Sequence, residues 1–393
     1  MKLYSELIGP YPYGKFALVE NFWDTGYGMP SFTLLGPKVI RLPFIINSSY
    51  PHEILHNWWG NGVFVDYEKG NWCEGLTAYL ADYLISENRG KGREYRMTTL
   101  QKYSDYVSAG KDFPLTEFRS RHSSASEAVG YGKSLMVWHM LRNLLGDENF
   151  RTGLRGFYTG NSFQYASFED LRAAFEKITG EGRLKPFFDQ LTGRAGAPAL
   201  SLISTRVSKG GLEGYNLEFT LAQTQDGPPY SLEVHAAIYL AGAGAPRMKT
   251  LPMRKKEETF HYSAPLMPVR LEIDPEFDIF RTLSPLETPP TLSRLLGASR
   301  PEIILPSGAA GAPWQVLAGA WNKDKENAPG ILDDSERSSA PASASYWVFG
   351  AGNRLAADFE KGLESYGARF TPDSVLIDNR SFPRAEHTFV FVL

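Results

Sequence analysis

The hydrophobic pattern of this chain changes from helical to β spacing near residue 198, and this change limits the folds that are open to it. Between about residues 48 and 192, apolar residues recur with the i, i+4, i+7 and i+8 spacing of a buried helix face, as in the segment 72–84. Residues 199–283 instead carry short β runs separated by glycine and proline turns. A Pro-rich joint at 285–290 then leads into alternating strands and helices. The pattern predicts an α+β multidomain chain.

Three domains follow from these boundaries. Residues 1–198 should form a mostly helical domain, residues 199–284 a small antiparallel β-sandwich, and residues 285–393 an α/β region. The final segment, 387–393, reads as a buried strand cut at its apolar end. We therefore expect that the chain is truncated at both ends and that its α/β region is incomplete.

Charge and composition exclude several classes of protein. Forty-one Lys and Arg against 44 Asp and Glu give a formal net charge of -3, which offers no electrostatic reason to expect nucleic acid or an anionic membrane as a partner. The chain has no secretory signal and no apolar run near the length of a membrane span, so we expect a soluble protein. The single cysteine, Cys73, excludes an internal disulfide framework and a Cys-rich metal site. Neither compartment nor oligomeric state follows from the sequence.

One motif indicates chemistry: His52-Glu53-Ile54-Leu55-His56. Residues four apart lie on one face of a helix, so both imidazoles can bind one metal ion. Glu53 is offset from that face and can reach a water molecule at the metal. Zinc suits imidazole nitrogen and carboxylate oxygen in a site with one position left for water. The alternative is a chance His-x-x-x-His pair on a helix surface.

Two further residues are candidates for the same site. Glu74 follows His56 by 18 positions and begins the next amphipathic helix, where it can fold back as a third ligand. Tyr131 lies between two glycines at the start of a later helix. The alternative for Tyr131 is an aromatic residue packed at a tight helix start.

Two stretches of the chain resemble the gluzincin metallopeptidases of the aminopeptidase N type. They are His52-Glu53-x-x-His56-Asn57-Trp58-Trp59-Gly60-Asn61 and Trp72-Cys73-Glu74-Gly75-Leu76. Tyr131-Gly132-Lys133-Ser134 resembles the Tyr-x-Lys-Gly segment of that family. The resemblance covers about residues 5–283, the catalytic domain and the β domain that follows it.

The resemblance implies a thermolysin-like catalytic domain and a zinc-dependent peptidase that acts on a peptide or protein. One Zn²⁺ per chain would be held by His52, His56 and Glu74. Glu53 would be the general base, and Tyr131 would donate a hydrogen bond to the oxyanion.

The chain departs from the family pattern in three respects. Seventeen residues rather than 18 separate His56 from Glu74, which a loop can absorb. Pro30 stands where the family has the glutamate that binds the substrate amine, which leaves Gly28 and Met29 as the substrate-binding candidates. We also expect this chain to lack the N-terminal domain of that family. We therefore expect an aminopeptidase-like enzyme without strict aminopeptidase specificity; the alternative is a catalytically weak relative that binds peptides or a partner protein.

Overall fold

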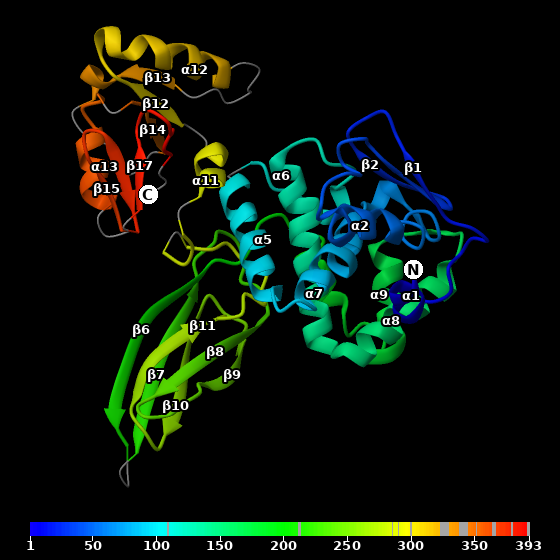
Figure 1. The fold of residues 1–393 in the computed structure, drawn as a ribbon. Helices are drawn as coiled ribbons and strands as arrows, with labels where there is room; N and C mark the ends of the chain where they lie inside the picture. Colours follow the sequence, from blue (N-terminus) through cyan, green and yellow to red (C-terminus); the bar gives the residue numbers. More distant parts are fainter. Residues whose placement is uncertain are drawn as a thin grey trace. The chain divides into compact units, whose positions relative to one another are not determined.

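The computed structural model of the 393-residue chain describes the following residues: 1–107, 110–210, 214–284, 286–289, 291–298, 301–322, 330–337, 345–350, 352–363, 367–378 and 380–390. They form two compact units, Met1–Ser284 and Pro285–Leu393 (Figure 1). The first unit combines a helical part with a β part. None of the described helices is both long and apolar enough to cross a bilayer.

Helices dominate the first unit as far as residue 191. They are α1 (Lys2–Leu7), α2 (Ser49–Leu55), α3 (Cys73–Ala78), α4 (Leu84–Glu87), α5 (Gly92–Tyr106), α6 (Ser124–Glu127), α7 (Ser134–Leu145), α8 (Asp147–Asn161), α9 (Phe168–Thr179) and α10 (Lys185–Leu191). Two π-helices interrupt this series: η3 (Tyr79–Tyr83) joins α3 to α4, and η5 (Ala128–Lys133) joins α6 to α7. The helical face predicted at 72–84 thus runs through a π-helix.

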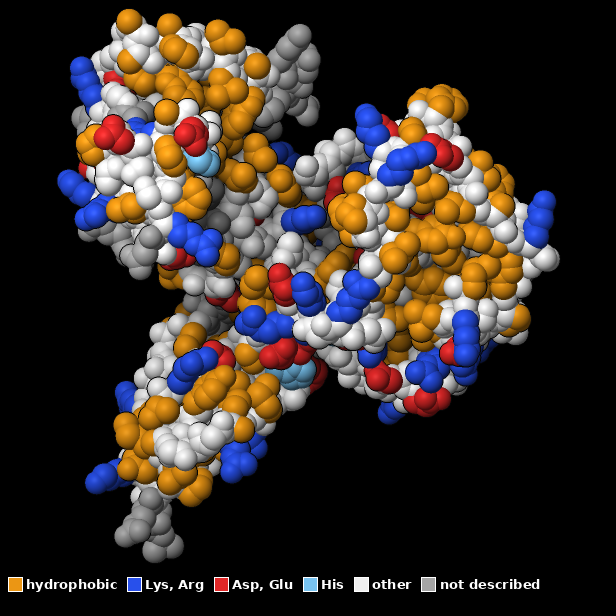
Figure 2. Space-filling model, in the orientation of Figure 1, with side chains coloured by type: hydrophobic (Ala, Val, Ile, Leu, Met, Phe, Trp, Pro, Cys, Tyr) orange, Lys and Arg blue, Asp and Glu red, His pale blue; other side chains and the backbone are white. Residues whose placement is uncertain are grey.

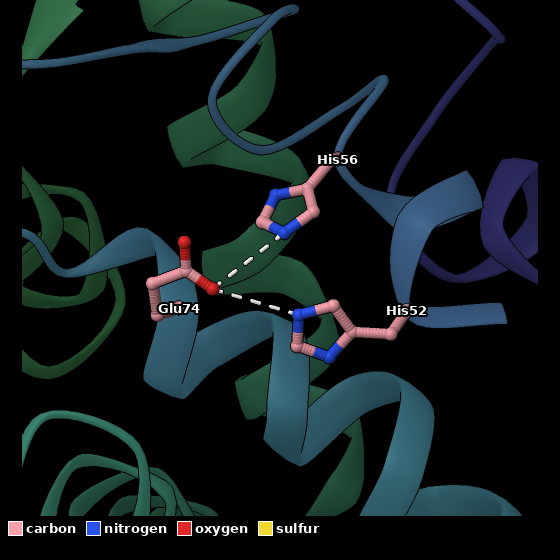
Figure 3. Close-up of side chains that lie close together, drawn as sticks. All are labelled: His52, His56 and Glu74. Carbon is pink, nitrogen blue, oxygen red and sulfur yellow. Dashed lines mark ion pairs between the residues drawn. The ribbon is translucent and has the colours of Figure 1, made fainter. Parts of the chain in front are cut away.

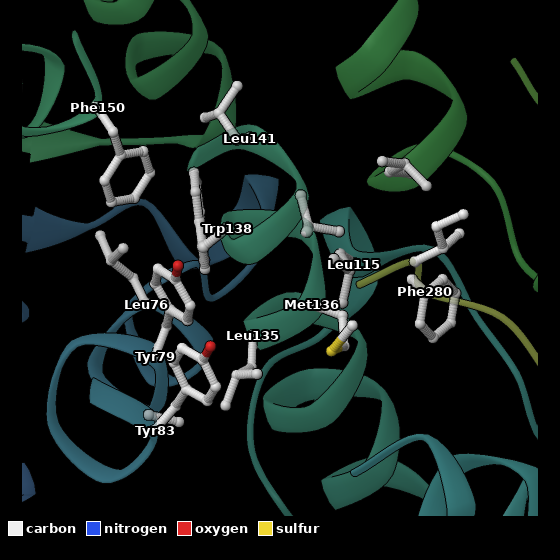
Figure 4. Packing of buried hydrophobic residues seen from close by; sticks show 14 of the residues in the cluster. Leu76, Tyr79, Tyr83, Leu115, Leu135, Met136, Trp138, Leu141, Phe150 and Phe280 are labelled. Atoms are coloured by element: carbon white, nitrogen blue, oxygen red, sulfur yellow. The ribbon is translucent and has the colours of Figure 1, made fainter. Parts of the chain in front are cut away.

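Large side chains fill the space between these helices. Trp58, Trp59, Trp72 and Trp138 are each fully buried, and the apolar spacing of α7 places Leu135, Trp138 and Leu141 on its inner face. Figure 4 shows side chains of α3, η3, α7 and α8 meeting in this core. The same cluster continues into the β part through residues such as Leu217 and Val234. The metal-ligand candidates therefore lie on helices whose other faces are fixed by packing.

A small sheet precedes α2. It consists of β1 (Ala17–Glu20), β2 (Gly26–Met29) and β3 (Phe32–Leu35) in the order β1-β3-β2, with β1 parallel and β2 antiparallel to β3. Thr33 and Leu35 are fully buried, whereas Tyr27 and Met29 are 47% and 37% exposed. Since side chains alternate along a strand, one face of the sheet packs inward and the other is open. Figure 2 shows apolar side chains gathered on the surface around β1 and β2.

The β part consists of two antiparallel sheets of three strands, β10-β7-β6 and β11-β8-β9. The strands are β6 (Leu200–Lys209), β7 (Tyr215–Gln223), β8 (Leu232–Leu240), β9 (Arg247–Met253), β10 (Glu257–Ala264) and β11 (Pro268–Ile273). The short β runs of the sequence, 199–204, 215–221, 231–239 and 269–273, predict β6, β7, β8 and β11 but not β9 or β10. Both missed strands are largely exposed and carry many polar residues, so their hydrophobic signal is weak. A two-stranded pair, β4 (Phe64–Val65) with β5 (Tyr165–Ala166), lies within the helical part.

The second unit contains both strands and helices. Its elements are α11 (Leu292–Gly297), β12 (Glu302–Leu305), α12 (Ala312–Asn322), β13 (Gly330–Asp333), β14 (Tyr346–Val348), α13 (Ala356–Leu363), β15 (Ala368–Phe370), β16 (Ser374–Ile377) and β17 (Arg380–Pro383). β12 lies between β13 and β14, parallel to both, while β15 to β17 form an antiparallel sheet. Ile303, Leu305, Ala318 and Phe349 form a separate small core.

The prediction of a strand at 387–393 is wrong for the part of this segment that the structure describes. Residues 387–390 have no regular structure and Val390 is 64% exposed, while residues 391–393 lie outside the described range. The last described sheet ends with β17 as its edge strand. An apolar run becomes a strand only where a neighbouring strand supplies partners for its backbone, and composition does not encode that neighbour.

Lys133, the last residue of η5, anchors the helical part to the segment before the β part. Its side chain is 1% exposed, and its Nζ donates to the backbone carbonyls of Arg194 (2.7 Å) and Gly196 (3.2 Å). Asp112 lies 3.8 Å from the same nitrogen. Burial lowers the pKa of Lys133 to about 8, against the opposing effect of Asp112.

We predict that the wild type gains stability relative to Lys133→Met as the pH rises. Since the pKa of Lys133 falls from 10.5 to about 8 on folding, the unfolded chain binds more protons between these values. The wild-type free energy of unfolding should gain about 2 kcal/mol on the variant between about pH 7.5 and about pH 9.5. Urea unfolding of both proteins at each pH measures this gain. A difference that stays constant, or that shrinks as the pH rises, would contradict the assignment.

Candidate metal centre

Helix α2 carries His52, and its C-cap residue is His56, so both imidazoles of the predicted cluster belong to this segment. Ile54 and Leu55 are buried against the core, and this packing orients the rest of the helix. His52 and His56 are one turn apart on the neighbouring face, with ring centroids 4.9 Å apart. Both side chains are largely buried, at 12% and 13% exposed.

Glu74 joins the two histidines from the first turn of α3. Its Oε2 lies 3.5 Å from His52 Nε2 and 3.6 Å from His56 Nε2 (Figure 3). One donor atom from each residue can be chosen so that all three lie within 4.8 Å of one another. The structure thus brings together the three side chains that the sequence predicts as ligands.

The outer nitrogen of each imidazole is held by an acceptor. His52 Nδ1 lies 2.7 Å from Asp82 Oδ2, and His56 Nδ1 lies 3.1 Å from the backbone oxygen of Trp59. Because a carboxylate and a carbonyl only accept hydrogen bonds, Nδ1 carries the hydrogen in both rings. Both Nε2 atoms therefore face Glu74, which is the arrangement that outer-shell partners impose on metal-binding histidines.

The donor set fits zinc in chemistry and in spacing. Zinc binds imidazole nitrogen and carboxylate oxygen at about 2.0–2.2 Å, so two ligands at corners of a tetrahedron lie about 3.3–3.6 Å apart. The separations of 3.5 and 3.6 Å from Glu74 Oε2 fall in this range. Burial alone would lower the pKa of His52, but Asp82 and Glu74 raise it to about 9. A bound cation would take the place of the Nε2 proton.

Glu53 and Tyr131 lie beside this cluster with altered acidity. Burial raises the pKa of the Glu53 carboxyl, and the two histidines oppose the shift. The ring of Tyr131 is stacked on that of His52 with centroids 6.3 Å apart. Burial, followed by the charge of Glu74, raises the pKa of the Tyr131 hydroxyl. The hydroxyl therefore remains a hydrogen-bond donor at neutral pH.

Strand β2 passes directly over α2. A Cβ atom at Gly28 would lie 2.4 Å from His56 Cβ, and one at Gly26 would lie 2.7 Å from Glu53 Oε1. Asn61 Nδ2 donates to the Gly28 carbonyl at 3.0 Å and to the His56 carbonyl at 2.9 Å. Gly28 is therefore in contact with the site. Met29 belongs to the opposite, exposed face of β2.

The sequence does not predict Asp82 as part of the site. Asp82 lies eight residues after Glu74 in a segment that is otherwise apolar, and this was the signal that could have identified it. Cys73 Sγ is 3.4 Å from His56 Nδ1, and burial raises the pKa of this thiol.

We predict that Gly28→Ala weakens zinc binding about tenfold or more, the usual scale for disturbing the support of a metal ligand. Its Cβ atom would lie 2.4 Å from His56 Cβ and 2.8 Å from the backbone oxygen of Glu53, so α2 must shift. Gly26→Ala meets only the end of the Glu53 side chain, which can move, and should bind zinc normally.

Gly14→Ala is the control, because a Cβ there has no atom within 4 Å. Competition with a chromogenic chelator gives the three dissociation constants. Equal affinity of the Gly28 and Gly14 variants would remove β2 from the site.

Comparisons with known proteins point to one family. Residues 46–191 match the model described as the Peptidase family M1 domain. The chain is similar to Aminopeptidase M1-D of Oryza sativa subsp. japonica, with 27% identity over 224 residues, which are 51% of this chain and 25% of that protein. It is also similar to the thyrotropin-releasing hormone-degrading ectoenzyme of Rattus norvegicus, with 22% identity over 212 residues, or 50% and 20% of the two chains.

Among solved structures, the chain is similar to Legionella pneumophila aminopeptidase A in complex with aspartic acid. The TM-score is 0.53 at 17% identity, and the match covers 71% of this chain and 32% of that chain, a likeness of fold. The present chain spans about a quarter of the length of the rice relative. Residues 46–191 are therefore similar to the peptidase family M1 domain, in agreement with the motifs around His52 and Glu74.

Proposed function

We propose that this chain is a zinc-dependent, aminopeptidase-like metallopeptidase that hydrolyses peptide bonds in a peptide or protein substrate. The observation that carries the proposal is the convergence of His52, His56 and Glu74 on one point beside Glu53 and Tyr131. In this proposal one zinc ion binds per chain. Residues 1–198 are the thermolysin-like catalytic domain, residues 199–284 the β-sandwich, and residues 285–393 an α/β region.

Each protein group has a defined task in hydrolysis. When bound, zinc supplies a Lewis acid for the scissile carbonyl and makes water a nucleophile at neutral pH. The Glu53 carboxylate takes a proton from the attacking water and passes it to the leaving amine, and its raised pKa suits both transfers. The Tyr131 hydroxyl donates to the carbonyl oxygen as negative charge develops there.

The raised pKa values of Glu53 and Tyr131 favour a peptidase over a protein that only binds peptides. A binding protein needs neither a buried carboxylate with a raised pKa nor a protonated phenol beside the metal ligands. Both are present here, and their pKa shifts arise from burial and from charges of the same cluster.

The turn between β2 and β3 supports relaxed specificity for the substrate's amino end. Pro30 and Ser31 form this turn, with Ser31 at a φ of 70°, and the Ser31 N–H is bound to Asn57 Oδ1 at 3.0 Å. The turn therefore offers no carboxylate to an ammonium group. The two acidic residues of the segment just upstream, Glu20 and Asp24, are exposed and paired with Arg41 at 2.8 Å and with Lys38 at 2.9 Å.

We predict that Glu53→Gln abolishes peptide hydrolysis and leaves zinc bound, because it removes a base and no ligand. Tyr131→Phe should retain substrate affinity but lower turnover by roughly 100- to 1,000-fold, the cost of one oxyanion donor. Turnover of an internally quenched peptide, with metal content measured in parallel, separates the two roles. If Glu53→Gln loses zinc together with activity, Glu53 is a ligand; unchanged turnover in Tyr131→Phe would make that residue structural.

We also predict weak discrimination between free and blocked N-termini. A buried ammonium needs a carboxylate partner, since an unpaired charge in a partly dry site costs several kcal/mol. A free and an N-acetylated form of one peptide, compared by kcat/KM, measure this dependence. A loss of more than about 100-fold on acetylation, near 2.7 kcal/mol, would reveal an amine anchor and favour strict aminopeptidase action.

A further inference from the structure

The π-helix η3 supports the metal centre from behind. Its residue Asp82 accepts the Nδ1 hydrogen of His52 at 2.7 Å and so fixes the orientation of that ring. Asp82 lies between two buried tyrosines of the same helix, Tyr79 and Tyr83, whose rings stack 5.0 Å apart at an angle of 10°. Whatever holds these two rings also fixes the position of Asp82. Figure 4 shows the two rings side by side in the core.

His139 of α7 packs against both tyrosines. Its ring meets theirs edge-on, with centroids 6.0 Å from Tyr79 and 5.4 Å from Tyr83. The Tyr79 hydroxyl lies 3.4 Å from His139 Nδ1. Arg96 of α5 adds a second contact by donating to the Tyr83 hydroxyl.

One carboxylate of the β part holds both His139 and Arg96. Asp278, which follows β11, accepts from His139 Nε2 at 2.8 Å and forms an ion pair with Arg96 Nη2 at 3.1 Å. His235 of β8 lies 3.3 Å from its other oxygen. Burial opposes ionisation, but these three partners hold the pKa of Asp278 well below its usual range. The carboxylate is therefore ionised and can hold the two histidines by hydrogen bonds and Arg96 by an ion pair.

We propose that Asp278 is a positioning residue for the metal ligand His52. It holds His139 and Arg96 against Tyr79 and Tyr83 and thereby fixes the π-helix that presents Asp82 to the imidazole. The β part, in this account, completes the metal centre without supplying a ligand. The inference rests on the proposed zinc site at His52, His56 and Glu74.

The test measures metal binding in the full chain rather than activity. Asp278→Asn keeps the size of the side chain but loses the charge that three donors share. His139→Phe keeps a ring against the tyrosines and removes both nitrogens. The readouts are the zinc dissociation constant, from chelator competition, and the visible spectrum of the cobalt-substituted protein, which reports ligand geometry.

A matched control separates positioning from general loss of stability. Glu176 of α9 is also a buried carboxylate, 6% exposed, that pairs with Arg172 and accepts from the Leu184 N–H at 2.9 Å. Among the described residues it has no hydrogen bond or ion pair with η3, so Glu176→Gln should bind metal like the wild type. Asp82→Asn is the reference for loss of the direct partner of His52.

Loss of a direct outer-shell partner typically weakens metal binding about 10- to 100-fold, and we expect a loss of this size for Asp82→Asn. Asp278→Asn acts through intermediate residues and should weaken zinc binding less, about three- to tenfold. The cobalt spectra of Asp278→Asn and His139→Phe should change in the same direction as that of Asp82→Asn. Wild-type affinity and spectrum in either folded variant would overturn the proposal, and so would an equal loss in Glu176→Gln. Absence of zinc binding in the wild type would instead refute the proposed function itself.

Discussion

The convergence of two imidazole nitrogens on one carboxylate oxygen is the arrangement on which the rest of the site depends. It requires α2 and α3 to approach within the reach of short side chains, with Glu74 Oε2 only 3.5 and 3.6 Å from the two Nε2 atoms. Glycines make this approach sterically possible. A Cβ atom at Gly75 would lie 2.0 Å from Ser134 Oγ, so α3 packs directly on the segment that carries Tyr131. Gly28 has the same role between β2 and His56.

Each of the two π-helices among the described residues carries one residue that contacts His52. Asp82 in η3 orients His52, and Tyr131 in η5 places its ring on the same imidazole. A π-helix is less favourable than an α-helix and is common at functional sites. Tertiary contacts stabilise each one here: His139 packs on η3, and the buried Lys133 anchors η5 to the segment before the β part. The metal site thus depends on polar contacts that reach beyond the helices carrying its ligands.

The candidate site was predictable from sequence where spacing within one helix is enough. The separation of His52 and His56 places both rings on one face in any α-helix, and Glu53 follows from the same motif. Asp82 was not predictable in this way, because its contact with His52 depends on how η3 packs against α2. The sequence alone also did not predict that Gly28 faces the site and Met29 faces away. This assignment requires the structure of β2, in which the two residues lie on opposite faces. Strands β9 and β10 were missed because they are exposed, and composition carries little signal for such strands.

X-ray absorption at the zinc edge of the zinc-loaded full chain tests the central claim most directly. The account predicts one zinc per chain with nitrogen and oxygen ligands only, at about 2.0–2.2 Å, and two imidazoles in the scattering pattern. In His56→Ala the imidazole contribution should fall to one. A sulfur ligand at about 2.3 Å, as Cys73 would give, or a shell that does not change in His56→Ala, would contradict the assignment of His52, His56 and Glu74.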